Sequence, residues 1–121
     1  MNAQRLREAL DAIAAMPGMD GCALVEIEAG MVWHAAGHIG DVQHFAEAAS
    51  DYWRLYGRLS HHFTGLGDLR ASVMIHTNGR ITMLPCGKGM LLVALTRQDS
   101  PVEWSEWQIR ARQLAKLVDQ L

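Results

Sequence analysis

The sequence predicts a single α/β domain of the α+β kind over residues 1–121, with the order α-β-β-α-β-β-β-α. Apolar residues recur with helical spacing in three long segments. Five shorter runs alternate or are continuously apolar, as strands are. Glycine and proline separate these runs, so most strands should be joined by short turns and pair antiparallel. The expected helices cover residues 2–16, 41–59 and a C-terminal segment from Pro101, and the expected strands cover residues 22–28, 31–36, 69–76, 80–86 and 90–96.

The first helix and hairpin follow from apolar spacing and turn residues. The helix carries one apolar stripe and should end at Pro17-Gly18. The run of residues 22–28 alternates as a strand does, and Glu26 and Glu28 fall on its polar face. A tight turn at Ala29-Gly30 then leads into the second strand.

The central helix, residues 41–59, carries more apolar surface than one sheet can cover. Asp41 is its expected N-cap. One apolar stripe holds Val42, Phe45, Ala49, Trp53 and Tyr56, and the other holds Ala48, Tyr52, Leu55 and Leu59. A helix lying on a sheet buries one stripe, so the second predicts contact with another surface, such as a second copy of the chain. The alternative interpretation is one wide stripe with its tyrosine hydroxyls in water.

The second half of the chain is expected to form a three-stranded meander and a last helix. Asn78-Gly79 between apolar runs is a strong hairpin signal. Pro85 cannot donate to a sheet ladder, so it should mark a strand end, an edge or a bulge. The run of residues 90–96 is apolar on both faces, which is typical of a central strand. Ser100-Pro101-Val102-Glu103 has the pattern of a capping box.

Composition favours a cytoplasmic protein that contacts other proteins. Half of the residues are apolar even before the 11 glycines are added, which suggests that an interface covers part of this surface. The net charge is −2 and the basic residues are scattered, so no nucleic-acid partner is expected. No run is long enough for membrane insertion, and residues 1–16 lack the apolar core of a signal peptide. Cys22 and Cys86 are expected to be reduced and buried.

No residue pattern in the sequence predicts an enzyme. A nucleophile elbow and a phosphate-binding loop before a helix are both missing. His34 and His38 are four residues apart on a strand that runs into a loop, and the adjacent His61 and His62 should diverge, so no metal site is expected. Glu26 and Glu28 could imitate a two-carboxylate site, but a solvated strand face explains them better. We expect no catalytic residues and no cofactor.

The element order and several segments resemble the roadblock/dynein light chain domain, in its bacterial branch. The residues that carry the resemblance are Gly21 to Val25, Val32 to Gly37, Gly65-Leu66-Gly67-Asp68-Leu69, Ala71 to Ile75, Asn78-Gly79, Ile81 to Leu84, Gly87 to Leu95 and the closing helix. The resemblance implies a five-stranded antiparallel sheet with the central helix on one face and the two terminal helices on the other, an arrangement also similar to longin and profilin-like domains.

The resemblance also implies a function. Members of this family are non-catalytic, form homodimers or heterodimers, and act as scaffolds or bind and regulate small Ras-like GTPases. Their third strands pair with each other and their central helices pack together. On this chain, the implied dimer interface holds Ala48, Tyr52, Leu55, Leu59, Ser72, Met74 and His76.

Two other functions are compatible with the sequence. One is a small-ligand sensor domain of profilin-like shape, which an apolar cavity between the sheet and a helix would favour. The other is a small enzyme that uses some of the six histidines, which metal analysis would detect.

Overall fold

The structure, a computed structural model, describes residues 2–121 and the side chains of residues 3–121. The expected domain begins at Met1, which lies outside these residues. The helices are α1 (Asn2–Ala14), α2 (Val42–Leu59) and α3 (Trp104–Asp119), and η1 (Ser60–Leu66) is a 3-10 helix. The strands are β1 (Gly21–Glu26), β2 (Val32–Gly37), β3 (Ser72–Ile75), β4 (Gly79–Pro85) and β5 (Met90–Arg97). All lie within two residues of the predicted bounds, except that β3 is shorter at its start and α3 begins three residues later.

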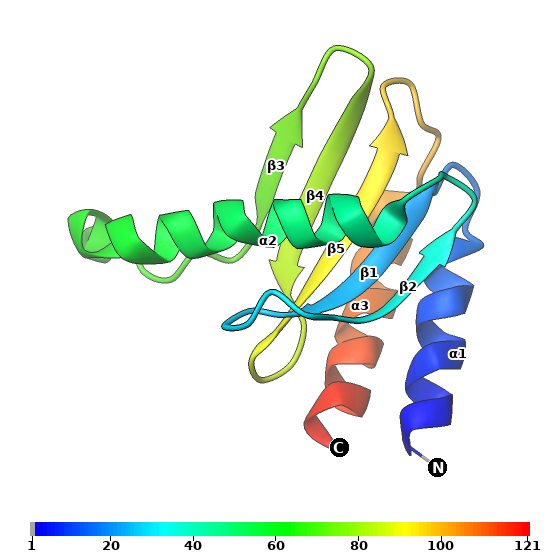
Figure 1. Ribbon diagram of the computed structural model, residues 1–121, viewed down its shortest axis with the longest axis horizontal. Helices are drawn as coiled ribbons and strands as arrows, with labels where there is room; N and C mark the ends of the chain where they lie inside the picture. The colour runs from blue at the N-terminus through cyan, green and yellow to red at the C-terminus, as the bar shows by residue number, and fades with distance from the viewer. Residues whose placement is uncertain (1) are drawn as a thin grey trace.

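The strands form one antiparallel sheet in the order β2-β1-β5-β4-β3. Helix α2 crosses one face of the sheet, and α1 and α3 lie side by side on the other (Figure 1). This three-layer arrangement and the element order confirm the predicted fold class. Strands β2 and β3 form the two edges of the sheet.

The core has two halves, one on each face of β1 and β5. Cys22 and Leu24 pair with Ala94 and Leu92 and face α1 and α3. The intervening residues of both strands face α2. As predicted, β5 is a central strand that is buried on both faces.

The prediction of a polar face on residues 22–28 was wrong. Strand β1 lies between β2 and β5, and its residues from Gly21 to Val25 are all buried because helices cover both faces. Glu26 is the exposed last residue of the strand, and Glu28 lies in the turn that follows it. The two acids therefore do not share a strand face.

The two predicted helix caps also differ from the structure. Asp41 precedes α2 as expected, but its backbone is left-handed (φ 66°) and its side chain makes no capping hydrogen bond. Helix α3 begins at Trp104 rather than Pro101, so Ser100 does not cap it. Instead, the Ser100 hydroxyl donates to the Gly18 carbonyl at 2.6 Å and ties the start of this segment to the end of α1. Pro85 is the last residue of β4, one of the positions predicted for it.

Candidate self-association surface

Helix α2 exposes a continuous apolar stripe on the side away from its own core. Val42, Ala46 and Ala49 are buried against the sheet, and Trp53 packs beside them. The exposed residues recur three and four positions apart, so they lie on one helical face. We call this the α2 stripe: Phe45, Ala48, Tyr52, Leu55 and Leu59.

The exposure of the α2 stripe is large for apolar side chains. Tyr52 and Leu55 are each 45% exposed, and Leu59 is 43% exposed. The prediction that Phe45 belongs to the core stripe was wrong, because Phe45 is 42% exposed and Ala46 takes the buried position. In a helix of 3.6 residues per turn with buried positions 42, 46, 49 and 50, residue 45 lies to one side of the buried face.

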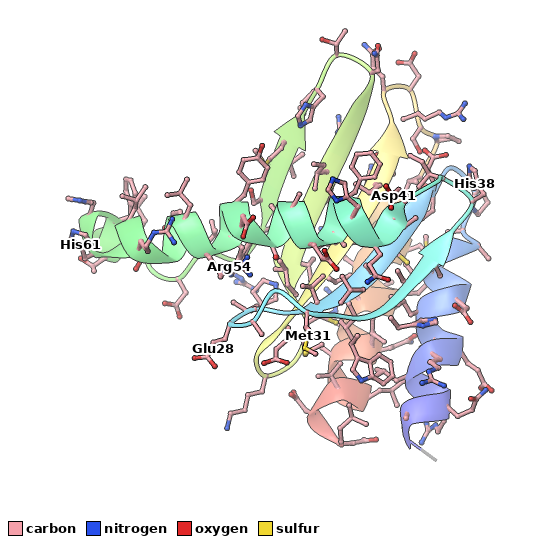
Figure 2. All side chains as sticks on the ribbon, viewed as in Figure 1. Glu28, Met31, His38, Asp41, Arg54 and His61 are labelled. Atoms are coloured by element: carbon pink, nitrogen blue, oxygen red, sulfur yellow. The ribbon has the colours of Figure 1, made fainter. Side chains whose placement is uncertain are left out.

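The α2 stripe continues into η1, which has no buried residue. Phe63 is 40% exposed and Leu66 is 84% exposed. Phe63 stacks on the ring of Tyr56, with the ring centroids 5.8 Å apart, so η1 folds back against the end of α2. The end of α2 and η1 project past the β3 edge of the sheet (Figure 1), and Figure 2 labels His61 at their far end.

Strand β3 is the open edge beside α2. It pairs with β4 and with no other strand of the described chain. Ser72 and Met74 are partly exposed, and Met74 packs against the core cluster beneath α2. His76 is exposed and lies just past the strand, where its backbone N–H donates to the Gly79 carbonyl at 2.7 Å. An edge strand of this kind leaves backbone N–H and C=O groups free to pair with another strand.

An open, mainly apolar groove of about 450 Å³ lies between α2 and the ends of β3, β4 and β5. Phe45, Ala48 and Tyr52 of the α2 stripe line one wall. Ile81 and Leu95 of the sheet line the other, with His76 at the rim. The groove joins the α2 stripe to the strand edge. The structure thus brings all seven predicted interface residues to one side of the molecule: Ala48, Tyr52, Leu55, Leu59, Ser72, Met74 and His76.

Polar side chains near the groove are engaged in holding the fold. The Asp20 carboxylate accepts from the Arg97 backbone N–H at 2.7 Å and lies 3.0 Å from the Nε2 atom of His38. Its backbone carbonyl accepts from the N–H groups of His38 and Ile39. Asp20 therefore links the end of β5 to the connection between β2 and α2.

Arg54 is anchored rather than free. Its guanidinium donates to the Ile27 carbonyl and to the Ser50 hydroxyl, each at 3.0 Å, and pairs with Asp51. Figure 2 labels it beside the β1–β2 turn, near Glu28 and Met31.

The metal-binding side chains of residues 3–121 are dispersed, and the two thiols are buried. No group of three or more His, Cys, Asp or Glu side chains in this part of the chain could hold a metal ion. Burial raises the pKa of both thiols, Cys22 and Cys86, to about 12, so each stays protonated at neutral pH. Among the helices of these residues, none is long and apolar enough to cross a membrane.

Solved structures share this fold. A Roadblock/LC7 domain from Streptomyces avermitilis matches with a TM-score of 0.74 and 21% identity, covering 96% of this chain and 93% of that chain. An MglB structure described as a tetrameric arrangement matches with a TM-score of 0.79 and 16% identity, covering 98% and 91%. The gliding protein MglB from Thermus thermophilus matches with a TM-score of 0.75 and 14% identity, covering 98% and 89%.

The chain therefore has the roadblock/LC7 fold, as the sequence resemblance implied. One of these similar structures, MglB from Thermus thermophilus, is described as a gliding protein. No protein-family model matches the sequence. No curated protein matches it either.

Proposed function

We propose that this protein is a non-catalytic, homodimeric regulatory or scaffold module whose partner is a small Ras-like GTPase. The observation that carries the proposal is the α2 stripe, which lies beside an open strand edge and an apolar groove. Exposed apolar surface of this size on one side of a small domain is typical of a protein interface.

Pairing through β3 gives a dimer of defined geometry. Two β3 strands that pair antiparallel are related by a two-fold axis perpendicular to the sheet, so both α2 helices lie on the same face. Helix α2 runs past the β3 edge, and so its end and η1 would extend over the partner's sheet (Figure 1). There they meet the partner's groove, which the partner's Phe45 and Tyr52 line. One arrangement thus covers the stripe, the strand edge and the groove.

Burial of the α2 stripe favours the proposed dimer. Tyr52, Leu55 and Leu59 are each less than half exposed, so covering what remains stabilises the interface by roughly 0.7–1.5 kcal/mol per side chain before the costs of ordering and association are subtracted. Each side chain counts twice under two-fold symmetry.

The GTPase partner is supported by the resemblance to roadblock domains and by the structural similarity to MglB. The anchoring of Arg54 argues for a binding role rather than for donation of a catalytic arginine from the middle of α2. The client surface would be composite, built from both copies.

The test uses the full chain and the small GTPases of the same cell, each loaded with GDP or with a non-hydrolysable GTP analogue. We expect calorimetry to give one GTPase per two chains, with a preference for one nucleotide state. Absence of binding in both states would contradict the GTPase partner. Undiminished binding by a monomeric Leu55→Glu variant would contradict the composite surface.

The groove supports a second candidate, a small-ligand sensor. Its volume of about 450 Å³ and its apolar lining suit a small apolar molecule. A sensor would remain a monomer and gain thermal stability from an added ligand, whereas a dimer would have the groove already filled. Thermal unfolding with a panel of small apolar compounds, run at several protein concentrations, separates the two.

A further inference from the structure

A second uncovered apolar surface lies on the opposite side of the sheet, away from α2. Strand register puts Val73 beside Thr82 and Ala94, and Ala94 belongs to the core half that α1 and α3 cover. Val73 and Ile75 therefore face the α1 and α3 side. They are 52% and 72% exposed, because α1 and α3 lie behind β1, β2 and β5 and leave β3 beyond their reach (Figure 1).

An open groove of about 510 Å³ adjoins the start of β3 and lies between α3, the end of β4 and the segment that precedes β3. Ala111 and Ala115 of α3 form one wall, and Leu84 and Ala71 form the other. We call the groove, Val73 and Ile75 together the back groove. Because it lies on the opposite face from the α2 stripe, dimerisation through α2 and β3 leaves it open and brings two copies of it together on one face of the extended sheet.

The back groove has a basic border. Arg70 and Arg112 line it, and register puts Arg80 beside Ile75 on the same face. None of these three arginines forms an ion pair within the side chains of residues 3–121. Asp68 is the one acidic residue among those that line the groove. In a chain with a net charge of −2, this is a local excess of unpaired positive charge beside apolar surface.

We propose that the back groove binds an amphipathic helix of a partner protein, with an apolar face bordered by acidic residues. The groove lies alongside α3, so an added helix could pack against α3 and rest on β3 and β4. Two strands about 4.8 Å apart offer a surface that suits one helix about 10 Å wide. Apolar side chains three and four residues apart on the added helix would contact Val73, Ile75 and Leu84. Its acidic side chains would pair with the arginines that border the back groove.

The test measures the binding of two designed helical peptides to the full chain by fluorescence anisotropy. Both peptides carry the same leucine face, and one is bordered by glutamate and the other by lysine. We expect the glutamate peptide to bind about tenfold or more tightly than the lysine peptide, with an affinity that falls as salt rises. Equal affinities, or binding of neither peptide, would overturn the proposal.

Variants locate the binding. The double variant Arg70→Glu/Arg112→Glu should weaken binding of the glutamate peptide about tenfold or more, and Val73→Thr/Ile75→Thr, which keeps β-branched residues in the strand, should also weaken it. Arg5→Glu, an exposed arginine on α1, is the matched control and should change little. Binding that survives both double variants would overturn the proposal.

The Leu55→Glu variant keeps this result separate from the proposed dimer. It should leave peptide binding within about twofold of wild type, since α2 and the back groove lie on opposite faces. Loss of peptide binding in this variant alone would place the peptide on the α2 stripe and refute the back groove. The sedimentation of Leu55→Glu tests the dimer independently of either result.

Discussion

The two halves of the sheet differ in how completely they are covered. On β1 and β5, helices cover both faces, and Leu24, Leu91, Leu92 and Val93 have no exposed surface. At β3, α2 covers one face in part, no helix of residues 2–121 covers the other, and Ile75 is 72% exposed. We call the part of the sheet around β1 and β5 the closed half and the part around β3 the open half. The closed half specifies the fold, and the open half leaves apolar surface exposed.

The largest expected effect is in the closed half. Leu92→Ala should lower the free energy of unfolding by about 2–5 kcal/mol, because it leaves a cavity in a fully buried site. Urea denaturation measures this loss. Leu121→Ala, at a leucine that is 63% exposed and away from the α2 stripe, is the matched control and should change stability by less than about 0.5 kcal/mol. Equal losses of stability for the two variants would contradict the difference in burial between the closed and the open half.

A smaller effect is expected at Asp20, which links the end of β5 to the connection between β2 and α2. Asp20→Ala removes the acceptor for the Arg97 backbone N–H and the partner of His38, and should cost about 1–3 kcal/mol. Asp11→Ala is the control, since the Asp11 side chain is 59% exposed where it pairs with His34. Thermal unfolding should show a clear shift for the first variant and little for the second.

Two glycines give a matched pair with opposite signs. Gly30→Ala should destabilise by about 1 kcal/mol or more, since Gly30 has φ 68° and an added Cβ would lie 2.8 Å from the Arg54 guanidinium. Gly57→Ala should stabilise by about 0.5–1 kcal/mol, because Gly57 lies in α2 with open space around its Cβ position. Denaturation midpoints that move in the same direction would contradict this.

The smallest effect at neutral pH concerns the two thiols. Cys22 and Cys86 have a raised pKa of about 12 in the folded chain, against about 9 in the unfolded chain. Below pH 9 both states keep the proton, so the thiols add no pH dependence. Above pH 9 the unfolded state loses protons first, and stability should fall as the pH rises toward 12. The Cys22→Ala/Cys86→Ala double variant should lose part of this slope in denaturation measured between pH 8 and 11.

The sequence predicted the elements better than their ends. Turn residues and apolar spacing were sufficient for the order and for the central position of β5. The polar face of residues 22–28 was wrong because Glu26 ends β1 and Glu28 lies beyond it, whereas the buried residues 22 to 25 are a continuous apolar run. The prediction that Ser100 caps the last helix was wrong because its hydroxyl donates to the Gly18 carbonyl, 82 positions away.

The candidate site was partly visible in the sequence. The spacing of Tyr52, Leu55 and Leu59 identified a second helical face, and its exposure in a single chain is what the structure adds. Phe45 was misassigned because a long helix offers several overlapping stripes. The back groove left no signal in the sequence, since it combines β3 with α3 from the far end of the chain.

Sedimentation velocity on three proteins tests dimerisation through the α2 stripe directly. The three proteins are wild type, Leu55→Glu and Ile109→Glu. Leu55 and Ile109 are matched, at 45% and 42% exposure on helix surfaces, but Ile109 lies on α3, away from the α2 stripe. We expect a wild-type dimer, a monomer or aggregate for Leu55→Glu, and an unchanged dimer for Ile109→Glu. A Leu55→Glu protein that sediments as the same dimer as wild type would contradict dimerisation through the α2 stripe.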